Sequence, residues 1–178
     1  MDPTPDPLPG SSLPPPAAGP ALESLVLRPS IVERLDFAAV FGRGGPVELE
    51  LGAGDGSFVL RAAAAAPERN FLAVERLLGR LRKIDRKGRR AGLANLRALR
   101  LEAAYVLRWM IPPGSLAGLH IYFPDPWPKR RHWKRRLVNA EFTGWAAEAL
   151  EPGGTVYVRT DDAPYFAQMT AVFGGNPR

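Results

Sequence analysis

A glycine-rich turn between a strand-like run and a helix-like run constrains the fold of this chain more than any other feature. The run Val47–Leu51 alternates apolar and acidic residues, as a half-buried strand does, and Gly52–Gly56 (GAGDG) follows directly. Ser57–Ala66 is rich in alanine and stops at Pro67, which is typical of a short helix. A strand, a tight turn and a helix in this order open the α/β folds that bind ligands at the carboxyl ends of their strands.

Strand-like and helix-like runs continue to alternate after this first unit. Strands that alternate with helices pair in parallel through right-handed crossovers, which place helices on both faces of the sheet. The sequence therefore predicts an α/β fold with a mostly parallel sheet, and residues 152–154 (PGG) are expected to form a turn before the fifth strand. The other expected strands are Asn70–Glu75, Leu96–Leu101, Leu116–Phe123 and Thr155–Thr160, and the other expected helices are Leu77–Ala91, Ala103–Ile111, Phe142–Leu150 and Tyr165–Phe173.

The N-terminal segment differs from the rest in composition. Residues 1–20 contain eight prolines, which remove backbone hydrogen-bond donors and leave little apolar surface to bury. Residues 1–21 are therefore predicted to be disordered, and residues 22–178 to form one domain. Within that domain, Ala21–Phe41 suggests short helical pieces broken at Pro29.

Composition excludes several classes of protein. The chain has no cysteine, which rules out a disulfide scaffold, a thiolate metal site and a cysteine nucleophile. Its only histidines are His120 and His132, which argues against a metal centre. No apolar run approaches the roughly 18–20 residues that span a bilayer, and no signal pattern follows Met1. We expect a cytoplasmic protein with no membrane partner and no metal, and a monomer is favoured.

The positive charge is concentrated in two stretches. Residues 76–100 carry ten Lys and Arg against one acid, Asp85, a net charge of +9, and residues 129–136 (KRRHWKRR) carry six with no acid. A polyanion is the expected partner of such a polarised molecule. For residues 76–100 a plain solvated face is an equally good interpretation. For residues 129–136 a polyanion is favoured, because six charges in eight residues repel one another.

Acidic residues end successive predicted strands. Glu50 precedes the glycine turn, Glu102 follows the third strand, and Glu75 lies about 20 residues beyond the turn, where a carboxylate can bind both ribose hydroxyls of an adenosine. Three carboxylates around one pocket repel each other unless a cation compensates them. A sulfonium cofactor suits them better than a dinucleotide, whose glycine fingerprint also fails at Ser57. A plain tight turn remains open, and Glu48 is interpreted as a polar strand residue.

The segment after the fourth strand combines three kinds of residue. Prolines at 124, 126 and 128 fix the backbone outside helix and sheet and hold Asp125 between two of them. Trp127 offers an aromatic surface to a base, and the basic run that follows can hold phosphates. Together they predict a nucleic-acid modification site, although Asp125 could also be a simple turn residue.

From Asp36 to Met169 the chain resembles the bacterial tRNA (guanine-N7)-methyltransferases, which use S-adenosylmethionine. The most specific stretch is Phe123–Leu137 (FPDPWPKRRHWKRRL). The resemblance implies a Rossmann-like class I methyltransferase fold. The other matching residues are Asp36-Phe37, Phe41-Gly42-Arg43, Pro46, Leu49–Gly52, Asn70-Phe71, Glu75, Asn95–Arg97, Pro152–Gly154, Thr160–Asp162 and Tyr165.

The resemblance also implies site residues. It places Glu50, Glu75, Glu102 and Asp125 in the cofactor site, with Asp125 as the catalytic candidate, and has Lys129 and Asp161 contact the RNA. Two departures from the family stand out. Glu102 stands where the family usually has Asp, and the family's later strands and Thr-x-Tyr-Glu motif are absent before Arg178. The chain is then either a fragment or recognises guanine differently, and the missing strands would leave an unpaired sheet edge.

The implied function is methyl transfer from S-adenosylmethionine to N7 of a guanine in tRNA. The sequence does not indicate which guanosine is methylated. N7 presents a lone pair on the major-groove edge, so in-line attack needs no deprotonation and catalysis rests on positioning. Asp125 would stabilise the cationic purine electrostatically. Three alternatives stay open: an RNA-binding methyltransferase-like protein with little or no turnover, a methyltransferase for another substrate, and a nicotinamide oxidoreductase.

Overall fold

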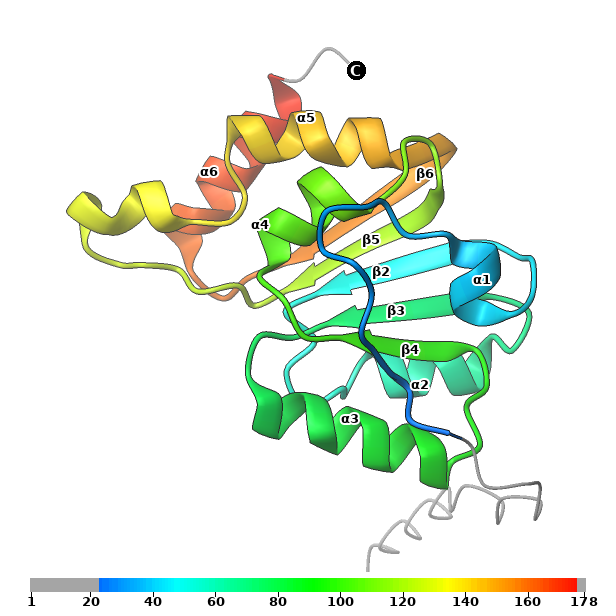
Figure 1. Cartoon of the computed structure of the whole chain (residues 1–178). Helices are drawn as coiled ribbons and strands as arrows, with labels where there is room; N and C mark the ends of the chain where they lie inside the picture. Colours follow the sequence, from blue (N-terminus) through cyan, green and yellow to red (C-terminus); the bar gives the residue numbers. More distant parts are fainter. Residues whose placement is uncertain (1–22, 176–178) are drawn as a thin grey trace, which may run out of the picture.

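The computed structural model of this chain describes residues 23–175 and contains one six-stranded sheet (Figure 1). The strand order is β1-β4-β3-β2-β5-β6, and every neighbouring pair is parallel, which confirms the predicted α/β architecture. The predicted disorder of residues 1–21 lies outside the described residues. The strands are β1 (Val26–Leu27), β2 (Val47–Leu51), β3 (Asn70–Val74), β4 (Leu96–Leu99), β5 (Leu116–Tyr122) and β6 (Leu150–Arg159).

Helices cover both faces of the sheet, as the alternation predicts (Figure 1). The regular helices are α1 (Phe37–Phe41), α2 (Val59–Ala65), α3 (Leu78–Arg90), α4 (Ala103–Tyr105), α5 (Ala140–Ala149) and α6 (Ala163–Gly174). A π-helical turn, η1 (Val106–Met110), continues α4, and a 3₁₀ helix, η2 (Arg130–Arg135), follows the proline-rich segment.

Alternation along the strands divides the interior into two cores. In β3, Phe71 and Ala73 pack with α2 and α3, whereas Leu72 and Val74 belong to the larger core beneath α5 and α6. Successive side chains of a strand point to opposite faces, so one strand supplies both cores. In β2 the apolar positions join the larger core, and Glu48 and Glu50 therefore point toward the face that carries α2 and α3.

Two elements at the ends of the sheet differ from the prediction. The two-residue strand β1 was not expected; it pairs with β4 through Val26 and Leu27. Strand β6 begins at Leu150, so the predicted turn at 152–154 is wrong. Those residues form an irregularity inside the strand, where the register against β5 shifts between Leu116 and Gly118. A bulge of this kind absorbs extra residues without ending the strand.

Strand β6 is the last strand of the sheet and pairs only with β5 among the described residues. Its exposed residues alternate with half-buried Val156 and Val158, which pack on the larger core. Within residues 23–175, no helix is long and apolar enough to cross a membrane.

Candidate functional site

The glycine turn needs all three of its glycines. Gly52, Gly54 and Gly56 have φ values of +77°, +58° and +84°, in the left-handed region that side chains disfavour. A Cβ on Gly56 would lie 2.9 Å from Ile84 and Leu60, so the turn also sits tightly against α2 and α3. The requirement for glycine is thus conformational at every position and steric at the last.

Glu75 ties this turn to the end of β3. One carboxylate oxygen accepts a hydrogen bond from the Gly54 N–H at 2.9 Å, and the other accepts one from the Leu77 N–H at 2.7 Å. The residue is 5% exposed, and its charge is met by backbone donors rather than by a cation. Each carboxylate oxygen can accept a second hydrogen bond, so Glu75 retains capacity for a ligand.

A cavity of about 460 Å³ opens at the carboxyl ends of the central strands. Glu75, Glu102 and Asp125 all line it, so three of the four acids predicted to share a cofactor site do share one pocket. Ligands of open α/β sheets bind at this end of the strands. The remaining lining residues are Leu51, Gly52, Val74, Arg76, Leu77, Arg80, Leu101, Ala103, Tyr122, Phe123, Pro124, Trp127, Arg135 and Leu137.

Glu50 is not among the lining residues. It is 5% exposed, and its Oε2 has no hydrogen-bond partner among the described residues. Burial raises the pKa of Glu50 to about 8, with further repulsion from Asp55 and Glu75, although a hydrogen bond from the Val59 backbone opposes the shift. The structure thus places Glu50 beside the glycine turn but outside the pocket lining, and its role in the cofactor site stays a prediction.

Glu102 has a local structural task as well as a place in the pocket. Its two carboxylate oxygens accept hydrogen bonds from the N–H groups of Ala104 and Tyr105, at 3.0 and 2.8 Å. It therefore caps the N-terminus of α4, where Asp would serve equally well. The longer side chain reaches the same backbone donors, so the departure from the family's usual Asp is structurally accommodated.

The loop that carries Asp125 is held in a strained conformation. Phe123 and Trp127 have φ values of +51° and +46°, and they are the only non-glycine residues with positive φ in the described part of the chain. Such backbone costs roughly 1–3 kcal/mol per residue and persists only where the surroundings impose it. Asp125 lies exposed between them, and its carboxylate makes no hydrogen bond or ion pair with any described residue. The loop thus presents an uncommitted acid to the pocket.

The two predicted RNA contacts, Lys129 and Asp161, lie outside the pocket lining. Both are exposed, and neither side chain has a hydrogen bond or ion pair within residues 23–175. Lys129 immediately precedes η2, and Asp161 immediately precedes Asp162, the N-cap of α6. Their place on the surface leaves them accessible, and their roles stay predictions.

Arg136 corrects the expectation that the whole basic run is available to phosphates. It is 2% exposed. Its Nε donates to the Pro126 carbonyl and its Nη1 to Gln168 Oε1, both at 2.7 Å, and Nη2 lies 3.6 Å from Asp162. Its guanidinium lies 4.5 and 4.6 Å from the ring centroids of Trp133 and Tyr165. Arg136 therefore fastens the Asp125 loop to α6.

Three arginines that the sequence indicated only through their charge border the pocket itself. Arg76 lines it from the connection between β3 and α3, and Arg80 lines it from the first turn of α3. Arg135 lines it from η2, with its guanidinium 5.0 Å from the Trp127 ring centroid. A count of charges could not have selected these three. Their selection depends on where α3 and η2 lie relative to the strand ends.

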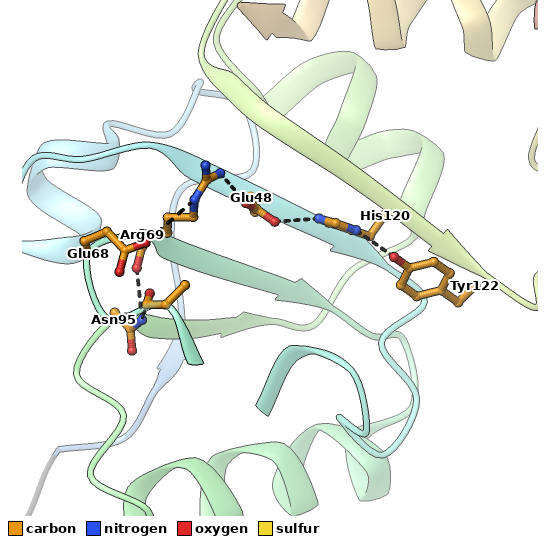
Figure 2. Close-up of polar contacts among 7 residues, drawn as sticks. Glu48, Glu68, Arg69, Asn95, His120 and Tyr122 are labelled. Atoms are coloured by element: carbon orange, nitrogen blue, oxygen red, sulfur yellow. Dashed lines mark hydrogen bonds and ion pairs between the residues drawn. The ribbon is translucent and has the colours of Figure 1, made fainter. Parts of the chain in front are cut away.

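Tyr122 connects the pocket to a buried polar network that the sequence did not reveal (Figure 2). Its hydroxyl lies 2.9 Å from His120 Nδ1, and His120 Nε2 lies 2.7 Å from Glu48 Oε2. Arg69 donates to the other oxygen of Glu48 at 2.5 Å, and its own carbonyl accepts from Asn95 at 2.9 Å.

Glu48 is therefore more than a polar strand residue. The hydrogen bond with His120, together with Arg69, holds the pKa of Glu48 below its usual value despite partial burial. The network fixes the tautomer and orientation of His120, and through it the position of the Tyr122 ring at the pocket wall. Alternation along β5 places His120 and Tyr122 on one face, and that was the available sequence signal.

No group of His, Asp or Glu side chains within residues 23–175 is arranged to hold a metal ion. The acids of the pocket instead meet backbone N–H groups or no partner at all.

The sequence of this chain is similar to those of known proteins. A family model described as "Putative methyltransferase" matches residues 44–178. A tRNA (guanine-N(7)-)-methyltransferase of Bordetella parapertussis is 44% identical over 160 residues, which cover 88% of this chain and 63% of the relative. One of Streptomyces coelicolor is 45% identical over 143 residues, covering 80% and 53%. The chain thus spans less than two thirds of the length of these curated relatives.

Solved structures show the same fold. The 16S rRNA methyltransferase KamB matches with a TM-score of 0.57 at 22% identity, covering 79% of this chain and 64% of that one. A geranyl diphosphate C-methyltransferase from Streptomyces coelicolor, solved with S-adenosyl-L-homocysteine, matches with a TM-score of 0.52 at 14% identity, covering 75% and 48%. At this level of identity the likeness establishes the class I methyltransferase fold alone.

Proposed function

The chain belongs to the bacterial tRNA (guanine-N7)-methyltransferase family, and from that premise we propose that it transfers a methyl group from S-adenosylmethionine to N7 of a guanine in tRNA. The observation that carries the proposal is the single pocket that brings Glu75, Glu102 and Asp125 together beside the glycine turn. A tRNA substrate implies action in the cytoplasm. We also propose that the protein acts as a monomer.

The residues present fit a cationic adenosine cofactor. Glu75 lies at the end of β3 with acceptor capacity to spare, the position from which a carboxylate binds ribose hydroxyls. Glu50 lies beside the turn outside the pocket lining, and its buried Oε2 has no hydrogen-bond partner among the described residues. When bound, S-adenosylmethionine supplies an electrophilic methyl group on a positively charged sulfur. Acids that otherwise repel one another at this end of the sheet are compensated by that charge.

Asp125 is the group best placed to act on the purine. Guanine N7 already carries a lone pair, so the chain needs no general base for this reaction. Asp125 instead offers a fixed negative charge near the base that becomes cationic, and its strained loop keeps that charge in place before the reaction. Trp127, whose ring faces the same pocket, offers a surface on which the base can stack.

Replacing Asp125 with Asn tests this role. The Asp125→Asn chain should keep its affinity for S-adenosylmethionine within about threefold, whereas turnover on tRNA should fall roughly 100- to 1000-fold, the usual effect of removing one electrostatic contact to a reacting group. Transfer of labelled methyl groups to tRNA measures turnover, and titration calorimetry measures cofactor affinity.

The matched control is Glu151→Gln, which neutralises an exposed acid on β6 outside the pocket lining. That variant should methylate tRNA at the wild-type rate. Near-full turnover by the Asp125→Asn chain would show that Asp125 has another role. Tight tRNA binding by the wild-type chain without any methyl transfer would instead support a binding protein.

A further inference from the structure

The outward face of α3 carries a dense row of cations that the proposed reaction does not use. Leu81, Ile84 and Gly88 face the core, and a Cβ on Gly88 would lie 2.6 Å from Leu25, so the helix cannot rotate about its axis. The other face is fixed toward solvent. Its exposed cations are Arg80, Arg82, Lys83, Arg86, Lys87, Arg89 and Arg90.

Few of these cations have an acidic partner. Lys87 lies 3.3 Å from Asp55, and Arg89 lies 4.0 Å from Asp85. Asp85 also accepts a hydrogen bond from the Leu25 N–H at 2.7 Å, so its charge is shared with the N-terminal segment. Lys83 and Arg86 have no hydrogen bond or ion pair with any described residue.

The local physics of a helix does not explain this pattern. No acid occurs in the first turn of α3, where negative charge stabilises a helix, and Arg80 lies there instead. Like charges three or four residues apart, such as Lys83 and Arg86, each destabilise a helix by about 0.2–0.5 kcal/mol. Only the cations of the last turn are favourable to the helix dipole. A bound polyanion would offset the repulsion along the rest of the face.

The position of α3 indicates where such a polyanion would bind. Leu77 and Arg80, at the start of the helix, line the pocket, and Arg135 lines it from η2. In Figure 1 the first turn of α3 and the yellow segment with η2 lie on opposite sides of the strand carboxyl ends. At 1.5 Å per residue, Lys83 and Arg86 lie about 5 and 9 Å farther from the pocket than Arg80.

We propose that the outward face of α3 is a second binding surface for the RNA backbone, which holds nucleotides flanking the one in the pocket. The inference rests on the proposed function and extends it to a named surface. Phosphate contacts of this kind position an RNA without reading its sequence. A membrane is the less suitable partner, because Leu81 and Ile84 of α3 are buried in the core and cannot enter a bilayer.

The test compares two double variants of the 178-residue chain that lose the same charge. Lys83→Ala with Arg86→Ala removes from α3 two cations that have no ion pair within residues 23–175, and alanine has a high helix propensity. Arg43→Ala with Arg61→Ala removes two exposed cations from the loop before β2 and from α2. Fluorescence anisotropy over a salt series measures binding to tRNA and to a short single-stranded RNA that contains one guanine.

The α3 variant should bind tRNA about tenfold more weakly near 0.1 M salt, and the slope of log affinity against log salt should decrease by about 1.5, as expected for two phosphate contacts. Binding of the short RNA, cofactor affinity and kcat should stay unchanged, while KM for tRNA rises. The control variant should match the wild type in every measurement.

Equal losses in both double variants would assign the effect to net charge and overturn the proposal. Unchanged tRNA binding by the α3 variant, combined with lost binding to phosphatidylserine vesicles, would overturn it in favour of a membrane. Failure of the wild-type chain to bind or methylate tRNA would instead refute the proposed function, so the two failures are distinguishable.

Discussion

The two basic stretches of the chain hold their charges in different ways. In α3 a regular helix fixes apolar residues inward and leaves cations such as Lys83 and Arg86 in solvent, without a hydrogen bond or ion pair to any residue from 23 to 175. In the η2 segment, defined here as residues 129–136, arginine side chains lie over aromatic rings. Arg130 lies over Trp133, Arg135 lies over Trp127, and Arg136 is buried.

This difference shows that the density of cations in a segment does not determine whether each cation stabilises the fold or stays on the surface. The η2 segment has the higher density of charge, yet its Arg136 is buried and binds the Asp125 loop through the Pro126 carbonyl. The α3 face, which a solvated surface could have explained, borders the pocket at Arg80. The neighbouring tryptophans and prolines, rather than the arginine count, distinguish the two.

The largest expected effect concerns Arg136. The Arg136→Ala change leaves Asp162, Gln168 and the Pro126 carbonyl without their buried partner. We expect the free energy of unfolding to fall by about 3 kcal/mol, in the range for breaking a buried charged network. Chemical denaturation measures the change.

Arg131→Ala is the matched control, because Arg131 lies in the same segment but is exposed, and its side chain makes no hydrogen bond, ion pair or ring contact with any described residue. Its unfolding free energy should stay within about 0.5 kcal/mol of the wild type. Equal stability of the two variants would show that the buried Arg136 contributes no more to the free energy of unfolding than an exposed arginine of this segment.

The same distinction between buried and exposed charge applies to the acids. Burial raises the pKa of Glu50 in the folded chain from 4.5 to about 8. The folded chain then holds a proton that the unfolded chain releases, so this group lowers the free energy of unfolding as pH rises from 4.5 towards 8. We expect a loss of about 2 kcal/mol between roughly pH 6 and 8.

Glu50→Gln removes this dependence, because its amide does not titrate. The difference in stability between the two chains should therefore widen in favour of Gln as pH rises. Glu151→Gln, at an exposed position, should follow the wild-type pH profile. A wild-type profile that is flat from about pH 6 to 8 would show that Glu50 is better solvated than its burial indicates.

The sequence predicted the elements that short stretches of the chain determine better than those that depend on contacts between distant residues. The alternation of strands and helices is local, and it yielded the parallel sheet and the ends of most elements. Strand β1 was missed because it exists only through its pairing with β4, about 70 residues away. Irregularity in β6 was missed because Pro152–Gly154 have the composition of a turn.

The sequence predicted those parts of the site that follow from the order of strands along the chain, and not those that depend on tertiary contacts. Acids at strand ends meet because parallel strands end at one edge, so the sharing of a pocket by Glu75, Glu102 and Asp125 followed from order along the chain. The burial of Arg136 did not follow, since it depends on Tyr165 and Gln168 of α6. Local preference also gave no sign of positive φ at Phe123 and Trp127.

A smaller effect is expected from the exposed arginines of the η2 segment. The triple change of Arg130, Arg131 and Arg135 to Ala should weaken tRNA binding about tenfold and reduce its salt dependence by about 2 in slope. Stability should change little, because none of the three is buried. Unchanged binding across a salt series would leave this segment without a role in holding phosphates.

The smallest expected effect is the coupling between the two surfaces. If the α3 face and the η2 segment hold different stretches of one RNA, their losses in binding free energy should add to within about 0.5 kcal/mol, because they share no contacts. Combining Lys83→Ala and Arg86→Ala with the η2 triple change measures the sum. A combined loss no larger than that of the triple change alone would mean that both surfaces hold the same phosphates in alternative binding modes. The pocket would then lie beside one RNA path instead of between two.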